Sequence, residues 1–446
     1  MTAGAIRAGL AVLLSAALVA SASAGERASK KTAAERITFY RARTGGPTTY
    51  PIYARLGLAY LDRYREAAKA RDWEEAVAAL RQSLRYQTNF EALLGLAMTL
   101  SERHHFGEAL PYAEEALRAM PSDIEAAGTL FDVHLALGNI AAADEILQEM
   151  LRAQRGFYAL SRLAALREYQ GDLHGALEAM RDARDAAVRS KFSPNILAWA
   201  EVRIGALHIA NCERQQARDA YERALRIIPG YAFAREHLAE WHAAQGHWPE
   251  AARMFRELLK TNASPAYRLA LAEALDARHQ AAAAERQRTK AREAMLTAER
   301  AGAKDQFRPL ALFYLEEGNV AEGLRFARLD QEVRQDALAT DTLAWALFRN
   351  GQNAEAQDFA RQAVQSGNKT PALLLHCGMI LCHAGDLAAG RPLIEQALAC
   401  TLAFGPAERK LSREGVACST AISASAAERD AQWRTRDNVN NANLEK

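Results

Sequence analysis

The residues most suited to chemistry form a short run of cysteines and histidines near the C-terminal end. The sequence HCGMILCH contains His376, Cys377, Cys382 and His383, and thiolate and imidazole are the side chains that bind zinc. If the run is helical, the two histidines lie about 10.5 Å apart along the axis. Both cannot then bind one zinc ion through bonds of about 2 Å. We therefore expect Cys377 to be a core cysteine and not a metal ligand.

Other stretches that resemble catalytic motifs each lack a required residue. SGNKT, at 366–370, lacks the upstream glycine of a phosphate-binding loop, and the histidines of HLAEWH, at 237–242, are not four residues apart as in zinc proteases. The Gly-x-Ser-x-Gly motif of serine hydrolases does not occur. The paired His104 and His105 are expected at the surface. The sequence thus predicts no enzyme, no catalytic or metal-binding residue, no cofactor and no small-molecule substrate.

The five cysteines are an odd number for an oxidising compartment, so at least one lacks a partner within the chain. Cys400 and Cys418 flank a predicted turn and could form a disulfide that staples the C-terminal end. The alternative is that the cysteines occupy sites where a small apolar side chain packs. The sequence leaves this choice open.

Small and apolar residues recur along the sequence at fixed spacings, and this pattern indicates pairs of helices. Two antiparallel helices would bring the small residues together where their backbones approach, and proline would end the second helix. Between 199 and 229 the recurring residues are Ile204, Gly205, Ala217, Tyr221, Ala224 and Pro229.

The pattern repeats along most of the chain and resembles the tetratricopeptide repeat, whose period is 34 residues. Intervals of 34 separate Phe90 from Ile124, Ala198 from Ala232 and Ala337 from Pro371. The resemblance implies an all-α fold, a right-handed α-solenoid of about ten helix pairs with a C-terminal capping helix. Glycines favour the tight turns within the pairs and stand at Gly138, Gly171, Gly246, Gly318, Gly351 and Gly385.

Five segments follow from this reading. Residues 1–24 have one charged residue, Arg7, before an apolar run and a small-residue cleavage site, as in a signal peptide. The alternative, a membrane anchor, needs a longer apolar run. Residues 25–48 are expected to be a flexible lead-in with about one helical turn at 37–41, followed by the solenoid at 49–402. A capping helix at 403–420 and a disordered tail at 421–446 complete the chain. The helix at 280–301 has few apolar residues and is expected to be exposed or mobile.

The order of segments is also similar to that of a group of exported bacterial tetratricopeptide proteins. The stretches that carry this resemblance are GDLHGALEAMRDA at 171–183, DTLAWALFRNGQNAEA at 341–356 and LLLHCGMILCHAGDLAAGRPLIEQAL at 373–398. The resemblance implies a scaffold on the envelope side of the cell, periplasmic or otherwise exported after signal-peptide cleavage. It supplies no catalytic residues.

The concave face of such a solenoid is the expected binding surface. Large apolar residues predicted to face a groove usually mark a contact site, although they could instead pack against neighbouring helices. Acidic residues in the middle of the groove, Glu125, Asp132, Glu236 and Glu240, would suit a basic peptide or be ordinary solvated charges. The predicted partner-binding residues are Trp199, Trp345, Phe348, Arg349, Leu375 and Met379.

The formal net charge of +2, from 56 basic and 54 acidic residues, gives no field that would recruit nucleic acid. We expect a non-catalytic periplasmic adaptor that binds a protein or peptide in its concave groove. The alternative is a structural subunit of an envelope export or polysaccharide-secretion assembly, a membrane-associated complex, that binds through its convex face and ends.

Overall fold

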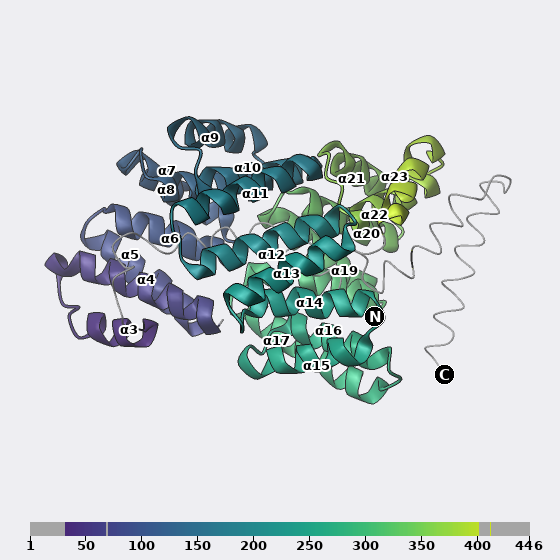
Figure 1. Ribbon diagram of the computed structural model, residues 1–446, viewed down its shortest axis with the longest axis horizontal. Coiled ribbons are helices and arrows are strands. Elements are labelled where there is room, and N and C mark those ends of the chain that lie inside the picture. Colours follow the sequence, from purple (N-terminus) through teal and green to yellow (C-terminus); the bar gives the residue numbers. More distant parts are fainter. Residues whose placement is uncertain (1–31, 68–69, 401–410, 412–446) are drawn as a thin grey trace.

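The computed structural model describes residues 32–67, 70–400 and 411. In this part of the chain the secondary structure consists of α-helices with two short 3-10 segments and contains no strand (Figure 1). The helices are α3 (Ala33–Arg41), α4 (Tyr50–Ala67), α5 (Ala70–Tyr86), α6 (Phe90–Ser101), α7 (Phe106–Ala119), α8 (Ile124–Ala136), α9 (Ile140–Ala153), α10 (Phe157–Tyr169), α11 (Leu173–Arg189), α12 (Pro194–Ala210), α13 (Arg214–Ile227), α14 (Ala232–Ala244), α15 (Trp248–Thr261), α16 (Pro265–Asp276), α17 (Ala281–Arg300), α18 (Phe307–Glu316), α19 (Val320–Val333), α20 (Ala337–Arg349), α21 (Asn353–Gln365), α22 (Pro371–His383) and α23 (Leu387–Ala399).

The helices α4 to α23 pack as ten consecutive pairs, which confirms the predicted solenoid. Within each pair the two helices make the most extensive contact, and the second helix of one pair then packs on the first helix of the next. First helices of neighbouring pairs also contact each other, as α20 does with α22. They form the inner wall: eleven of the 13 residues of α20 are buried, against three of the 13 in α21.

The turns within the pairs have the backbone conformation that the glycine pattern predicts. All six predicted turn glycines have positive φ, from +74° at Gly138 to +87° at Gly385. In three other pairs a larger residue adopts the same left-handed conformation, namely His104, Cys212 and His279. A side chain in this conformation has a steric cost that glycine avoids.

Close approach between paired helices explains the small residues inside them. In the last pair, a Cβ added at Gly378 would lie 2.9 Å from the carbonyl oxygen of Gly390. In the pair α12–α13, Gly205 makes room for the ring of Tyr221, because an added Cβ would lie 2.3 Å from its Cε1 atom. Larger residues at these positions would force the helices apart.

The chain before the first pair is more ordered than predicted. Instead of a single helical turn, residues 33–41 form α3, which begins with a capping box between Thr32 and Glu35. Ala33 and Ile37 are buried as α3 packs on α4. The long helix α17 is anchored by the buried side chains of Ala284, Ala291 and Met295, and its other 17 residues are exposed or half-buried, as its low apolar content predicts.

The solenoid closes on itself, which the repeat pattern did not predict. Turns within pairs of the N-terminal half (α4 to α13) lie against loops between pairs of the C-terminal half (α14 to α23) along a line that we call the seam. Figure 1 shows that α20 to α22 lie beside α10 to α12, although the two sets of helices are far apart in the sequence. The seam joins 103–108 with 298–305, 136–138 with 335, 170–171 with 367–369, and 212 with 400.

Three predicted segments lie outside the described residues: the signal peptide at 1–24, most of the capping helix at 403–420, and the tail at 421–446. Of the cap only Leu411 is described, and it packs on the core of the C-terminal half. Among the described helices, none has the length and apolar content needed to cross a membrane.

Candidate functional site

Four of the six predicted partner-binding residues are buried. Trp199 and Trp345 are each 4% exposed, Met379 is 1% exposed and Leu375 has no exposed surface. Phe348 is partly buried, and Arg349 is exposed. The prediction that these large apolar side chains face an open groove is therefore wrong for the four buried residues.

The physical reason is that first helices of neighbouring pairs pack on each other. The ring of Trp345 stacks on His376 of the next pair, with centroids 4.5 Å apart and planes at 11°. Trp199 packs edge-on against Phe157 of the preceding pair at 5.8 Å. These rings form the inner wall between pairs, so they contribute to stability. Whether any of the six residues contacts a partner stays a prediction.

The acidic residues predicted for the middle of the groove have partners within the chain. The guanidinium of Arg162 donates a hydrogen bond of 2.8 Å to Asp132, and the Tyr267 hydroxyl donates one of 3.0 Å to Glu236. Burial raises the pKa of Asp132 to about 6, and nearby Arg162 only partly offsets this effect. These contacts link first helices of neighbouring pairs along the inner wall, so the acids hold the solenoid together.

A second cluster of buried polar side chains lies in the C-terminal half. Arg334 forms an ion pair with Asp336, and the Arg308 guanidinium donates a hydrogen bond of 3.0 Å to the hydroxyl of Thr342. Asp330 is 1% exposed, and neither of its carboxylate oxygens has a hydrogen-bond partner among the described residues. Burial therefore raises the pKa of Asp330 to about 6.

The cysteine and histidine run at 376–383 is part of the core. Cys377 has no exposed surface, as predicted, and burial raises the pKa of its thiol well above the usual range. His376 is 4% exposed and lies 3.2 Å from the carboxylate of Asp341. Across the described ranges no three histidine, cysteine or acidic residues are placed to hold a metal ion.

The structure contains a disulfide, and it is not the Cys400–Cys418 pair that the sequence left open. Cys400 is bonded to Cys212, which lies 188 residues earlier, with their Cα atoms 5.4 Å apart. The possible staple between Cys400 and Cys418 does not form, because Cys400 is bonded to Cys212. Cys418 itself lies outside the described residues. Sequence spacing could not identify this pair, since the two cysteines meet only when the solenoid closes.

The paired histidines also lie at the seam, and the prediction that they are at the surface is wrong for His104, which is buried, whereas His105 is half-buried. His104 is 3% exposed, and the imidazole Nε2 of His105 lies 2.9 Å from the carbonyl oxygen of Gly302. Burial lowers the pKa of His104 well below its usual value, and the charge of Arg334 adds to this effect. The signal in the sequence was a histidine at the turn position where six other pairs have glycine, and the structure shows that His104 adopts φ = +59° there.

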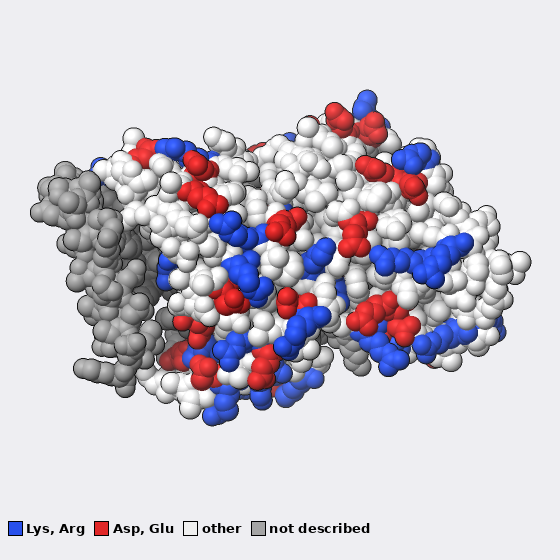
Figure 2. Space-filling view, turned by 180° about the vertical axis from the view of Figure 1, so that it is seen from behind, with Lys and Arg blue, Asp and Glu red and all other residues white. Residues whose placement is uncertain are grey.

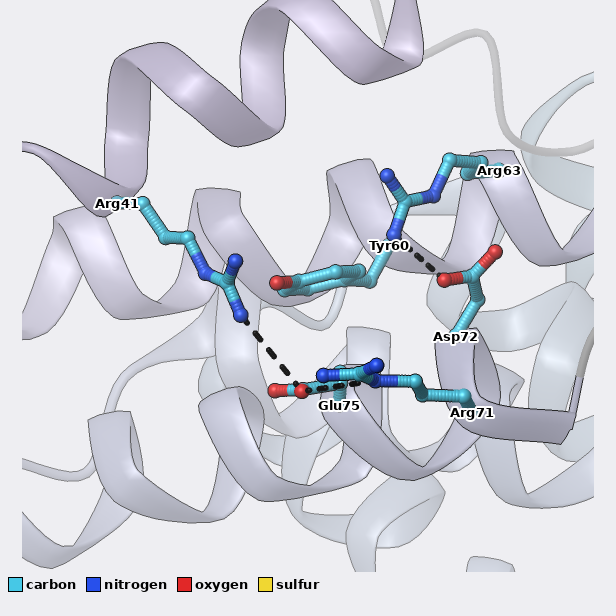
Figure 3. A pocket seen from close by; sticks show the side chains of 6 residues that line it. All are labelled: Arg41, Tyr60, Arg63, Arg71, Asp72 and Glu75. Carbon is cyan, nitrogen blue, oxygen red and sulfur yellow. Dashed lines mark hydrogen bonds and ion pairs between the residues drawn. The ribbon is translucent and has the colours of Figure 1, made fainter.

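An open pocket lies at the N-terminal end of the solenoid, between α3, α4 and α5 (Figure 3). Its volume is about 490 Å³, and the phenol ring of Tyr60 lies at its centre between the guanidinium groups of Arg41 and Arg63. Arg41 and Arg71 both point to the carboxylate of Glu75, at 3.6 and 3.8 Å. The pocket is lined by Arg41, Tyr60, Arg63, Arg71, Asp72 and Glu75.

The pocket has one more positive than negative side chain. Arg63 and Asp72 form a short ion pair of 2.6 Å. The guanidinium groups of Arg41 and Arg71 are instead 57% and 81% exposed and share one carboxylate at distances longer than a hydrogen bond. This end of the molecule can therefore accept an acidic group beside an aromatic ring. The face drawn in Figure 2, by contrast, has both signs of charge interspersed and no large field of one sign.

The architecture places the chain in the class of α-solenoids, which act through extended surfaces. Residues 100–167 match the family model of the tetratricopeptide repeat. The ten helix pairs continue on both sides of the matched residues, so the fold of the described chain is an α-solenoid of tetratricopeptide-like pairs. Members of this family are generally non-catalytic scaffolds that bind other proteins.

Individual relatives are distant. Anaphase-promoting complex subunit 7 of Arabidopsis thaliana is 29% identical over 200 residues, which are 42% of this chain and about a third (32%) of that protein. Among solved structures, pilF of Pseudomonas aeruginosa is 16% identical with a TM-score of 0.36, and covers 51% of this chain and 95% of its own. The human IFIT1 dimer with PPP-AAAA is 16% identical with a TM-score of 0.40, covering 80% and 73%.

Proposed function

We propose that this chain is a non-catalytic scaffold of the cell envelope that binds a protein partner through its outer face and ends. This is the structural-subunit alternative of the sequence analysis. The supporting observation is the asymmetry of burial between the two helices of most pairs, although α14 and α15 are buried to a similar extent. First helices such as α20 are buried on nearly every side, whereas second helices such as α21 leave most of their residues accessible.

The concave-groove adaptor is the less favoured function. A partner in the groove would need apolar side chains that it could reach, and Trp345, Leu375 and Met379 are engaged in the packing between pairs. Exposed Arg349 and partly buried Phe348 remain accessible at the end of α20. They are available to a partner that approaches from the rim of the solenoid.

The pocket around Tyr60 is the contact point that we favour at the N-terminal end. An acidic side chain or chain terminus of a partner would replace Glu75 between Arg41 and Arg71, which are exposed, whereas Tyr60 is only 2% exposed and would support the pocket from below. Because these two guanidinium groups are solvated and flexible, each contact would contribute modestly, and a partner would need additional surface on α3 or α5. We expect neither nucleic acid nor a small-molecule substrate.

The proposed periplasmic location rests on the signal-peptide pattern at 1–24. A disulfide between Cys212 and Cys400 suits an oxidising compartment. Fractionation of cells that express a tagged full chain tests the location. The tag should be recovered in the periplasmic fraction, with the protein shortened by about 24 residues; an unprocessed protein in the cytosol would contradict the proposal.

Cross-linked capture from the envelope fraction tests the binding surface. The wild type should be compared with Arg41→Glu/Arg71→Glu, and with Arg118→Glu/Arg226→Glu as a control with the same change of charge on exposed second-helix positions. We expect a protein partner to be lost only with the first variant. If Phe348→Ala/Arg349→Ala loses the partner while both other variants retain it, the rim of the groove binds and the N-terminal pocket does not.

A further inference from the structure

The seam between the two halves has almost no apolar contact. Each apolar core cluster of the described residues is built from pairs that are neighbours in the chain, and none joins the two sides of the seam. Hydrophobic burial therefore stabilises the individual pairs and their stacking but contributes little to closure. Opening the seam would leave these cores intact.

Polar contacts at the seam are concentrated at the end nearest the N-terminus. Arg103 donates a hydrogen bond of 3.2 Å to the carbonyl oxygen of Ala298 and lies 3.8 Å from Asp305. Lys304 lies 3.7 Å from Glu108, but both side chains are partly solvated and such pairs stabilise weakly. This end of the seam is thus held by a few charged contacts.

Farther along, the seam is held mainly by contacts to the backbone and by the disulfide. The backbone N–H of Gln335 donates a hydrogen bond of 3.2 Å to the carbonyl oxygen of Ala136. At the next step Gly171 and Gly367 bring two backbones together, since a Cβ added at Gly171 would lie 2.0 Å from the Gly367 carbonyl oxygen. The last step is the disulfide between Cys212 and Cys400.

The position of Cys212 indicates that the disulfide has a specific role. Cys212 occupies the turn position where six other pairs have glycine, and it adopts φ = +63°. A side chain in this conformation costs stability relative to glycine, and Cys212 is exposed at this turn. What the cysteine adds is a covalent bond to the end of α23.

We propose that the Cys212–Cys400 disulfide is a redox latch that holds the two halves of the solenoid together, and that its reduction opens the seam while the helix pairs remain folded. In closure, the two thiols lose two protons and two electrons as the S–S bond forms. The oxidant is the disulfide of a dithiol–disulfide exchange protein, which passes through a mixed disulfide and leaves as two thiols. Reduction by a dithiol of the same class reverses these steps.

Backbone amide exchange at Gln335 reports on the latch directly, because its hydrogen bond crosses the seam. Exchange should be measured by NMR or by mass spectrometry of short peptides, on the full mature chain, in oxidised wild type, reduced wild type and Cys400→Ser. We expect exchange at Gln335 to be about tenfold faster or more in the last two samples. Amides of Phe131 in α8 and Leu343 in α20, inside helices on either side, should be unchanged.

Controls separate the latch from other effects of thiol chemistry. Cys382→Ala removes a buried thiol that is not part of the disulfide and should leave exchange at Gln335 at the wild-type rate. Adding reductant to Cys400→Ser should change nothing further. Peptide mapping of oxidised wild type without reductant should recover Cys212 linked to Cys400.

Three results would overturn the proposal. The first is mapping that finds Cys400 linked to Cys418, or both Cys212 and Cys400 as thiols in the oxidised protein. The second is equal exchange at Gln335 with and without the bond, which would show that the polar contacts alone close the seam. The third is faster exchange at Phe131 and Leu343 to the same extent as at Gln335, which would show unfolding in place of opening.

Discussion

Substitution of Gly205 by alanine tests the packing rule on which each helix pair depends. A Cβ at this position would lie 2.3 Å from Cε1 and 2.6 Å from Cδ1 of Tyr221. The ring cannot move away freely, because Tyr221 is 1% exposed and its other face stacks on His237 with centroids 5.2 Å apart. Either α12 and α13 must separate, or the stacked rings must shift together.

The expected magnitude follows from two opposing terms. Overpacking a filled core costs about 1–3 kcal/mol, and contacts this short place the substitution near the upper end. Alanine gains about 1 kcal/mol over glycine within a helix. We therefore expect Gly205→Ala to lower the free energy of unfolding by about 2 kcal/mol. Gly107→Ala is the matched control, since Gly107 is in α7 and an added Cβ there meets nothing within 4 Å; it should stabilise by up to about 1 kcal/mol.

Urea unfolding followed by far-ultraviolet circular dichroism, with the disulfide intact, measures both variants. The two free energies of unfolding should differ by about 2–3 kcal/mol, with similar dependence on urea concentration. In a Tyr221→Leu background the penalty at Gly205 should shrink, because the ring that the new Cβ meets is gone. If Gly205→Ala is as stable as Gly107→Ala, the proposed role of small residues between paired helices is refuted.

Three further predictions follow from the buried groups and caps. Burial raises the pKa of Asp330 to about 6, so the folded state holds this proton more tightly than the unfolded state. The free energy of unfolding of wild type should therefore fall by an amount on the order of 2–3 kcal/mol as pH rises from about 4 to about 6, and Asp330→Asn should not show this fall. Equal pH profiles for the two proteins would contradict this. In the same urea assay Trp345→Ala should lower the free energy of unfolding by about 3–5 kcal/mol, whereas Arg349→Ala should lower it by less than about 0.5 kcal/mol. A Trp345→Ala variant as stable as wild type would show that this ring is not part of the core. Thr32→Ala removes the side-chain cap of α3 and should cost about 0.5–2 kcal/mol, seen as faster amide exchange in α3, and unchanged exchange there would show that packing on α4 alone holds the helix.

The sequence predicts the helix pairs well because their determinants are local and repeated. Glycines such as Gly138 and Gly385 recur where the turn requires positive φ, and small residues such as Gly205 recur where helices approach. These requirements act within about 34 residues, so they can be read from spacing. The boundary between the fourth and fifth pairs is local in the same way, because α12 begins at Pro194, a residue suited to the first position of a helix.

Closure of the solenoid could not be predicted in this way. It results from small rotations between successive pairs, which add up over about six pairs. The repeated residues determine the packing within a pair and do not show how large the total rotation is. Two consequences of closure were therefore not predicted, namely the burial of His104 at the seam and the bond between Cys212 and Cys400. The candidate site was missed for a related reason, since an apolar residue such as Trp345 on the inner wall has the same spacing whether it faces a partner or the next pair.

Zero-length cross-linking between the two halves tests the closed solenoid most directly. Lys304 and Glu108 are 3.7 Å apart across the seam, so a carbodiimide should couple the amine to the carboxylate in the monomer. We predict recovery of this linked peptide pair from wild type and its loss in Glu108→Gln, with the Cys212–Cys400 pair retained in both. An open solenoid would give no such link in the monomer, and the concave face would then be available to a partner after all.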